Sequence, residues 1–220
     1  MNVQQLREKY LSRSVLWRFF WVLFANILMG ASVGVLFVAD MGSDPLSTFS
    51  RGLSMVLPVS YGNCQLLVNI VLIIVMLLFE RHLIGAGTII NMVLIGYIAE
   101  FTEGLLRRAP FIGAAPGMPV RIAAIVVGLV LFVMTVAVYM TAELGTSPYD
   151  ALPVFLSSKL PFSFQVVRIS FDLLMVCLGW LFGNTPGIVT VLMVLTIGPV
   201  VSWFGKHVAN RLFKKETSFV

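Results

Sequence analysis

The chain has 220 residues, of which 59% are hydrophobic and 11% are charged, and its mean hydropathy is +0.97. Soluble domains carry roughly 25% charged residues and disordered chains have few aromatic residues, whereas 12% of this chain is aromatic. The composition excludes a soluble enzyme and a disordered linker, and it predicts a protein of the lipid bilayer. The net charge of +5 does not indicate nucleic-acid binding, because the basic residues lie in the tails and one loop, where they orient a membrane protein.

The first membrane helix is expected at residues 19–39, directly after a basic tail at residues 1–18. Its run of about 21 apolar positions is too long for the core of a signal peptide, and no cleavage site is evident. Cys64 and Cys177 both lie in apolar stretches, where a thiol behaves as a small hydrophobic side chain. No disulfide is therefore predicted.

Six apolar stretches are long enough, or nearly so, to cross about 30 Å of hydrocarbon as α-helices. They are residues 19–39, 62–79, 83–106, 122–142, 162–182 and 186–205. Two shorter segments, 45–58 and 148–161, are each bracketed by prolines. Each has 14 residues and would reach about 21 Å as a helix. The sequence thus predicts an all-α, polytopic transmembrane bundle in which two helices are too short to span.

The two short segments belong to a predicted internal repeat, because positions 103 residues apart, and later 102 apart, carry matching chemistry. The pairs include Asp40 and Glu143, Met41 and Leu144, Gly42 and Gly145, Pro45 and Pro148, Asn69 and Asp172, Gly85 and Gly187, and Thr88 and Thr190. We therefore predict two tandem homologous repeats, each of three long helices and one short Pro-bounded helix. The expected parts are a tail at 1–18, a first repeat at 19–108, a linker at 109–119, a second repeat at 120–210 and a basic tail at 211–220.

Two topologies are open, which differ in whether the short helices cross the membrane. If they cross, eight helices span, the repeats run parallel, and Arg107, Arg108 and Arg121 lie on the cytoplasmic side. If they do not cross, six helices span, the repeats are inverted, and these arginines lie outside. The distribution of basic residues favours the topology with eight crossings, whereas the length of the two short helices favours the topology with six. We give charge more weight and expect eight crossings with both termini in the cytoplasm.

The starts of both short helices have the pattern of a capped N-terminus. Asp44 and Ser147 suit the N-cap, Pro45 and Pro148 suit the first helical position, and a glycine two residues before each cap permits a sharp turn. Because the helices are short, at least one end of each should lie within the membrane. Its free N–H groups and positive dipole end then need an acceptor, which a substrate can supply. The alternative is a capped turn that only holds two helices apart.

A polar stripe is predicted on the second long helix of each half. Gln65 and Asn69 are four residues apart, and Arg168 and Asp172 occupy the matching positions, so each pair shares a helix face. A carboxylate at mid-helix costs roughly 2.5–3.5 kcal/mol on insertion scales, so Asp172 must face protein or water, with Arg168 as its nearest partner. We expect the pair to line a cavity that takes a substrate group or a proton. The alternative is a structural ion pair that fixes the packing between the halves.

No catalytic or cofactor motif is present in the sequence. The two histidines, His82 and His207, lie near helix ends and give no basis for a metal site. Phosphate-loop, serine-elbow and metalloprotease patterns are absent as well. The sequence therefore predicts neither an enzyme nor a bound cofactor.

Several short motifs resemble those of a known family. They are Gly30 and Gly34, Met41-Gly-Ser-Asp-Pro45, Pro58-Val-Ser-Tyr-Gly62, Asn69 and Gly85-Ala-Gly-Thr88. Together they are similar to the YczE/YyaS/YitT family of bacterial membrane proteins over residues 15–210. The YczE branch fits best, because the soluble C-terminal domain common in the YitT branch is lacking. The resemblance implies a multi-pass protein of the bacterial cytoplasmic (inner) membrane.

We expect a small-solute transporter, of the secondary type, for an anionic or zwitterionic metabolite. The predicted site lies between the repeats and comprises Asp44, Pro45, Asn69, Ser147, Pro148, Arg168 and Asp172, with Asp172 as the carrier of a coupling proton. The alternative is a membrane scaffold or regulatory protein that acts through a partner protein. The expected partners are the lipid bilayer and the solute, with no nucleic acid, and a homodimer is left open.

Overall fold

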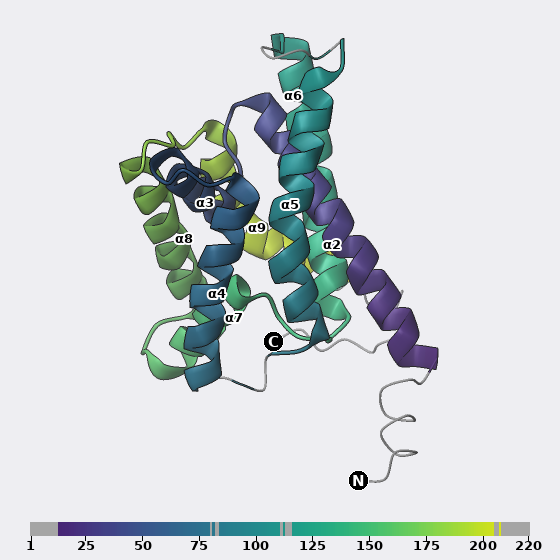
Figure 1. Cartoon of the computed structure of the whole chain (residues 1–220). Coiled ribbons are helices and arrows are strands. Elements are labelled where there is room, and N and C mark those ends of the chain that lie inside the picture. The colour runs from purple at the N-terminus through teal and green to yellow at the C-terminus, as the bar shows by residue number, and fades with distance from the viewer. Residues whose placement is uncertain are drawn as a thin grey trace.

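The computed structural model describes residues 13–79, 81, 84–110, 112, 116–204 and 207. Within these residues the chain forms helices and no strands, which confirms the all-α fold (Figure 1). The helices are α2 (Arg13–Ala39), α3 (Pro45–Val56), α4 (Tyr61–Phe79), α5 (Ala86–Arg108), α6 (Met118–Thr141), α7 (Pro148–Lys159), α8 (Phe164–Leu181) and α9 (Ile188–Phe204). Most of the predicted basic tails, residues 1–12 and 211–220, lies outside the described residues, as do 111 and 113–115 of the predicted linker.

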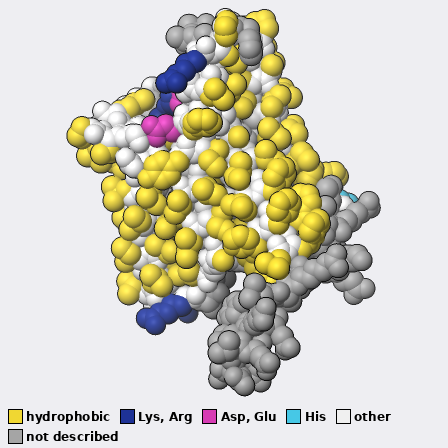
Figure 2. Space-filling view, turned by 45° about the vertical axis from the view of Figure 1, so that its right-hand side comes forward, with side chains coloured by type: hydrophobic (Ala, Val, Ile, Leu, Met, Phe, Trp, Pro, Cys, Tyr) yellow, Lys and Arg dark blue, Asp and Glu magenta, His cyan; other side chains and the backbone are white. Residues whose placement is uncertain are grey.

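Five of the described helices are long and apolar enough to cross a membrane: α2, α4, α5, α6 and α8. Helix α9 carries a shorter apolar stretch, Ile188–Val201. Hydrophobic side chains cover the side of the molecule in Figure 2, and the charged side chains visible there gather toward its two ends. A bilayer requires this distribution, so the protein is a membrane protein whose lateral surface contacts lipid.

Helices α2 and α5 run side by side in the same direction. Gly30 of α2 contacts Ile98 of α5, and Gly34, one turn further along α2, contacts Thr102, one turn further along α5. Because lipid is as apolar as a protein core, close van der Waals contact of this kind stabilises helix pairs in membranes. The two glycines therefore serve helix packing.

Helices α4 and α6 are antiparallel to α2 and α5. Arg18, near the start of α2, donates a hydrogen bond to the carbonyl of Ala142, just beyond the end of α6, at 3.5 Å. The backbone N–H of Gly62, near the start of α4, donates to a carboxylate oxygen of Glu100, toward the end of α5, at 2.9 Å. The chain thus reverses direction between α2 and α4, although α3 lies between them in the sequence.

The short helices lie at opposite ends of the bundle (Figure 1). Arg51 of α3 donates two hydrogen bonds to Glu103, near the end of α5, at 2.9 and 3.0 Å. Helix α7 lies at the other end, where the ring of Phe155 stacks on the ring of Phe79, the last residue of α4, with 5.1 Å between centroids. Each short helix therefore enters the bundle from one end only.

The structure does not support the expected eight crossings, because α3 and α7 are not among the described helices that are long enough to span. Each short helix has 12 residues and reaches about 18 Å, well short of about 30 Å of hydrocarbon. Arg107, which the charge argument placed on the cytoplasmic side, forms ion pairs within the bundle. It contacts Asp40 at 2.6 Å and Glu103 at 3.0 Å, and these ion pairs tie the end of α5 to the end of α2.

One hydrophobic core joins helices from both halves of the chain. Its members include Leu36 of α2, Ala99 of α5, Phe132 of α6 and Val189 of α9. Further contacts link α3 with α8 and α4 with α7. The two stretches that the sequence predicts as repeats therefore pack against each other.

The turns that precede α3 and α7 have the same backbone geometry. Asp40 and Glu143 have φ values of 51° and 54°, and Gly42 and Gly145 have φ values of 102° and 110°. Residues with a Cβ atom rarely adopt φ values such as those of Gly42 and Gly145, which explains why glycine occupies both positions. These are two of the residue pairs that the sequence matches.

Each turn is bound to the start of a long helix from the other half. The N–H of Val189, at the start of α9, donates to the carbonyl of Met41 at 3.0 Å. The N–H of Gly87, at the start of α5, donates to the carbonyl of Leu144 at 2.8 Å. These reciprocal contacts hold both turns in place and so position the short helices that follow.

Candidate functional site

The first turn of each short helix is capped as the sequence predicts. Asp44 is the N-cap of α3, and its Oδ2 accepts a hydrogen bond from the backbone N–H of Ser47 at 3.0 Å. Ser147 is the N-cap of α7, and its Oγ accepts from the backbone N–H of Asp150 at 3.1 Å. Pro45 and Pro148 follow the caps, at helical positions where no N–H is missed.

Both of these helix starts lie in the interior of the bundle. Leu46 of α3 and Tyr149 of α7 belong to one buried cluster, although the two helices enter from opposite ends. The other buried members come from the middle of α4 and α8: Val68, Leu72, Phe171 and Met175. The N-terminal ends of α3 and α7 therefore converge between α4 and α8, at about mid-depth.

A network of charged groups connects α7 with α8 at this depth. Asp172 is completely buried, and its carboxylate accepts hydrogen bonds from the Tyr149 hydroxyl and from Arg168 Nε, the latter at 3.2 Å. Arg168 Nη1 donates to Asp150 Oδ1 at 2.6 Å. The Ser147 hydroxyl lies 2.7 Å from the other carboxylate oxygen of Asp150. Arg168 is thus shared by two carboxylates, and its guanidinium lies 5.0 Å from the centre of the Tyr149 ring.

Asp172 does not face open space in this structure, contrary to the expected cavity. Both of its carboxylate oxygens are bonded to protein groups, one to Tyr149 and one to Arg168. A buried ion pair with complete hydrogen bonding is a stable arrangement in the absence of a ligand. The Asp172 end of the network is therefore closed, whereas the side chains of Arg168 and Asp150 are each 17% exposed.

The first half of the chain carries an uncharged counterpart of this network. The Tyr61 hydroxyl of α4 lies 2.9 Å from Gln65 Oε1 and 3.0 Å from Ser47 Oγ of α3. Asn69 Nδ2 donates to the Gln65 carbonyl at 3.0 Å. Gln65 and Asn69 are the residues of α4 that the sequence matches with Arg168 and Asp172 of α8.

Two buried oxygens in the candidate site lack a partner among the described residues. They are Oδ1 of Asp44 and Oδ1 of Asn69. Both residues were predicted for the site, Asp44 on the start of α3 and Asn69 on the polar stripe of α4. The site therefore combines one set of groups with complete hydrogen bonding and two acceptors without a donor.

The predicted site residues did not include Tyr61, Tyr149 and Asp150. The sequence does contain a signal for Asp150. In α3 the N-cap is Asp44 and the third residue after it is Ser47. In α7 the acid and the hydroxyl residue have exchanged these two positions, as Ser147 and Asp150. The tyrosines carry no such signal. Their roles depend on how the short helices pack against α4 and α8.

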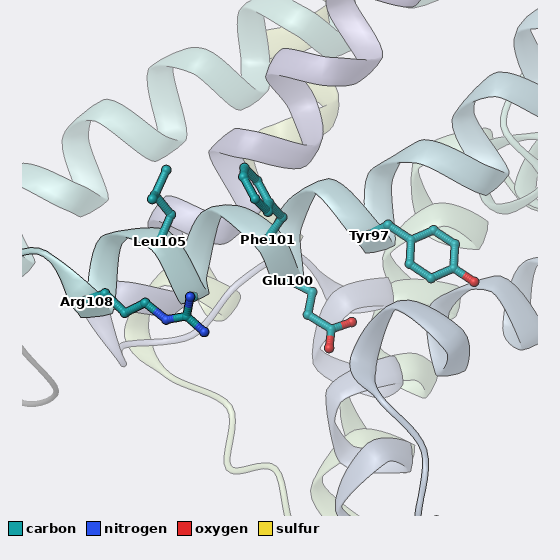
Figure 3. Close-up of a pocket in the computed structure, with 6 residues that line it drawn as sticks. Tyr97, Glu100, Phe101, Leu105 and Arg108 are labelled. Atoms are coloured by element: carbon teal, nitrogen blue, oxygen red, sulfur yellow. The ribbon is translucent and has the colours of Figure 1, made fainter.

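A surface groove of about 330 Å³ lies elsewhere, along α5. Figure 3 shows its side chains projecting from that single helix. The lining residues are Tyr97, Glu100, Phe101, Gly104, Leu105 and Arg108. None of the predicted site residues contributes to it. Among the described residues, no group of three or more His, Cys, Asp or Glu side chains is arranged to hold a metal ion.

The fold and the buried charged network define a polytopic helical membrane protein. Residues 16–206 match the model of a family of unknown function, DUF6198, and the chain belongs to that family. The match covers all eight described helices except the first turn of α2.

Two relatives extend this assignment. An uncharacterised protein of Haemophilus influenzae is 29% identical over 189 residues, which cover 86% of this chain and 84% of the relative. The uncharacterised membrane protein YczE of Bacillus subtilis is 26% identical over 188 residues, with 84% and 83% covered. No solved structure matches the chain. The predicted membership of a YczE-like family of membrane proteins is therefore confirmed.

Proposed function

We propose that this protein is a small-solute transporter of the secondary type, with its site where the starts of α3 and α7 meet α4 and α8. The observation that carries the proposal is Arg168, whose side chain is 17% exposed and which two carboxylates share at mid-depth. Ionisable side chains inside a membrane are costly, at roughly 2.5–3.5 kcal/mol each on insertion scales, and they mark substrate and ion pathways. A chain that needed only a packed bundle would have apolar residues here.

The matched turns support an internal repeat of inverted orientation. The φ values at Asp40 and Gly42 recur at Glu143 and Gly145, and the two short helices enter from opposite ends. Inverted repeats with interrupted or short helices that meet at mid-depth are a common plan of secondary transporters. In that plan the two halves exchange conformations, which exposes one site alternately to either side.

The charges around the site favour a zwitterionic solute over a purely anionic one. Asp44 occupies the N-terminus of α3, and Asp150 lies in the first turn of α7, so both positive dipole ends already face a carboxylate. Arg168 remains the cationic group for a solute carboxylate. A cationic group of the same solute would be attracted by the surrounding acids.

We also propose an orientation in the bacterial inner membrane. Helix α2 begins and α7 ends at the same end of the bundle (Figure 1). Arg18 lies near the start of α2, and Lys159 is the last residue of α7. By the positive-inside rule this end is cytoplasmic, which agrees with the expected cytoplasmic termini. Arg51 and Arg107 then lie near the outer face, where Glu103 pairs with both.

Transport is tested in two steps, because the solute must first be identified. Small metabolites are screened by their effect on the melting temperature of the purified protein; a ligand at 100 times its dissociation constant stabilises by about 2.7 kcal/mol. Uptake of each hit into proteoliposomes is then compared between the natural chain and Asp172→Asn. Loss of uptake with retained folding supports the site, whereas unchanged uptake in this variant shows that the solute binds elsewhere.

The alternative is a membrane scaffold or regulator that acts through a partner protein. The observation in its favour is the complete hydrogen bonding of Asp172, which needs no ligand. A scaffold would tolerate substitutions in the network that preserve folding, and it would lose partner binding on substitution of exposed residues such as Phe101. A metabolite screen without hits, together with a co-purifying protein that Phe101→Ala releases, would support this alternative.

A further inference from the structure

Two oxygens beside the Arg168 network stand out because they are buried and accept no hydrogen bond from any described residue. Asp44 is 8% exposed and Asn69 is 2% exposed, and in each the Oδ1 atom is without a partner. An unsatisfied buried acceptor destabilises a protein by about 1–3 kcal/mol, and by more when it is charged. Both atoms are acceptors, so the missing partner is a hydrogen-bond donor or a cation.

Asp44 and Asn69 lie at a similar depth in the interior. Ser47 of α3 and Gln65 of α4 both contact the Tyr61 hydroxyl, which fixes these two helices against each other. Asp44 lies one turn before Ser47, and α3 starts in the interior, so Asp44 is one turn deeper than this contact. Asn69 lies one turn after Gln65, and α4 runs inward, so it is also one turn deeper.

No described side chain supplies a positive charge to Asp44. The titratable groups that interact with it electrostatically include Tyr61 of α4, Tyr149 of α7 and Asp172 of α8. The tyrosines are neutral and Asp172 repels a second carboxylate. Helix α9 has no titratable side chain in Ile188–Phe204.

The nearest cation of the network is already shared. Arg168 is bonded to Asp150 and Asp172, so three carboxylates, with Asp44, stand against one guanidinium. The positive end of the α3 dipole offsets only part of the charge on Asp44. The buried group therefore has an excess of negative charge and a vacant acceptor on each of two side chains.

We propose that Asp44 and Asn69 form a buried site that takes up a monovalent cation, with Asp44 as its anionic ligand. The inference builds on the proposed transport function, in which this cation is the coupling ion. A proton on Asp44 Oδ1 and a sodium ion between the two oxygens are two forms of the same chemistry, since either one adds a positive charge and satisfies the free acceptors. Asp172 is then the fixed counter-ion of Arg168 and not the proton carrier that the sequence suggested.

Two substitutions at Asp44 separate its charge from its structural role. Asp44→Asn removes the charge but keeps the cap, because Asn caps helices as well as Asp does. Asp44→Ser copies the cap that Ser147 provides in α7 and serves as a second variant if the first does not fold. The matched control is Asp40→Asn, which removes a carboxylate that lies at the helix end and pairs with Arg107, at a positive φ that Asn tolerates.

The test measures the melting temperature of the purified full chain in lipid nanodiscs, in sodium chloride and in choline chloride of equal ionic strength, from about pH 5 to about pH 8. If the cation is sodium, sodium chloride raises the melting temperature of the natural chain and of Asp40→Asn by about 3 °C or more, and that of Asp44→Asn not at all.

If the cation is a proton, the two salts give equal melting temperatures, and stability depends on pH. A folded state that keeps a proton on Asp44 binds more protons than the unfolded chain, so the melting temperature falls as the pH rises through this titration. The pH-dependent infrared band of a neutral carboxyl C=O reports the same proton directly. Asp44→Asn is expected to lack both the slope and the band, and Asp40→Asn to keep them.

The proposal is overturned if the natural chain shows neither effect, or if the sodium effect or the carboxyl band persists in Asp44→Asn and Asp44→Ser. Cation binding is measured here without any solute. A negative result therefore removes the cation site and leaves the transport function to its own uptake assay.

Discussion

Arg168 of α8 forms an ion pair with Asp150 of α7, with 2.6 Å between Nη1 and Oδ1. The same guanidinium also forms an ion pair with Asp172 on its own helix. The two carboxylates are not equivalent in this arrangement. Asp150 joins two helices, whereas Asp172 is four residues from Arg168 and completely buried. The effect of removing each member of the network therefore follows from the charges that are left behind.

Arg168→Gln is expected to destabilise the protein more than Asp172→Asn. Without Arg168, the buried Asp172 and the partly exposed Asp150 both lose their cation, and breaking a buried pair costs about 3–5 kcal/mol. Asp172→Asn leaves the pair of Arg168 and Asp150 intact, and Tyr149 still donates to the Asn carbonyl, so the cost is about 1–2 kcal/mol. Unfolding of the purified variants in a denaturing detergent series measures both.

The control for this comparison is Arg18→Gln. Its ion pair with Glu143 is 3.8 Å long, and the Glu143 side chain is 54% exposed. Exposed pairs of this kind contribute about 0–1 kcal/mol, so little change is expected. Equal losses for Arg168→Gln and Asp172→Asn would contradict the assignment of Arg168 as the shared cation.

The helix starts could be predicted from the sequence because their signals are local. Pro45 and Pro148 begin α3 and α7 as expected, since a cap, a proline and a preceding glycine specify a helix start without reference to the rest of the fold. The pairing of Arg168 with Asp172 was also predictable, because side chains at i and i+4 meet on any helix.

Features that depend on packing could not be predicted in this way. Whether α3 crosses the membrane depends on where α4 begins. The ion pair of Arg107 was not predictable either, because its partner Asp40 is 67 residues away in the chain. The contact of Tyr149 with Asp172 likewise requires α7 to pack against the middle of α8. The internal sequence match does not predict this contact, because the position matched with Tyr149 in the first half is Leu46.

Gly187→Ala is expected to destabilise the fold by about 1–3 kcal/mol, as overpacked substitutions do. An added Cβ would overlap the carbonyl of Met41, which accepts the hydrogen bond from Val189. Gly85→Ala is expected to have a similar cost, because its Cβ would overlap the carbonyl of Leu144. Thermal unfolding of the two variants measures whether the reciprocal turn contacts contribute equally.

Gly198→Ala is the matched control for the glycine pair. It lies within α9, and an added Cβ there meets nothing within 4 Å. Alanine is favoured over glycine inside a helix by roughly 0.5–1 kcal/mol, so this variant should be as stable as the natural chain or more so. A comparable loss in all three variants would mean that the close contacts with the turns are not the cause.

Arg51→Lys is expected to destabilise the packing of α3 against the end of α5. Arg51 makes two hydrogen bonds to Glu103, and its guanidinium carbon lies 4.2 Å from the centre of the Phe37 ring. Lysine keeps the charge but loses the two-pronged geometry and the stacking, at a cost of about 1–2 kcal/mol. Thermal unfolding measures the loss, and Arg108→Lys, at an exposed arginine of α5, is the control with no expected change. Equal stability of Arg51→Lys and the natural chain would show that charge alone holds this helix.

The six-helix topology predicts that Met118 and Lys159 lie on opposite sides of the membrane. Met118 starts α6 at the end of the bundle where α3 lies, whereas Lys159 ends α7 at the other end. With eight crossings both residues would be cytoplasmic. Single cysteines at these positions, in a chain whose Cys64 and Cys177 are replaced by alanine, are treated in intact cells with a membrane-impermeant maleimide. The expected result is labelling of Met118→Cys only. Labelling of Lys159→Cys only would mean that the orientation is reversed, and equal protection of both cysteines until the cells are lysed would restore the topology with eight crossings.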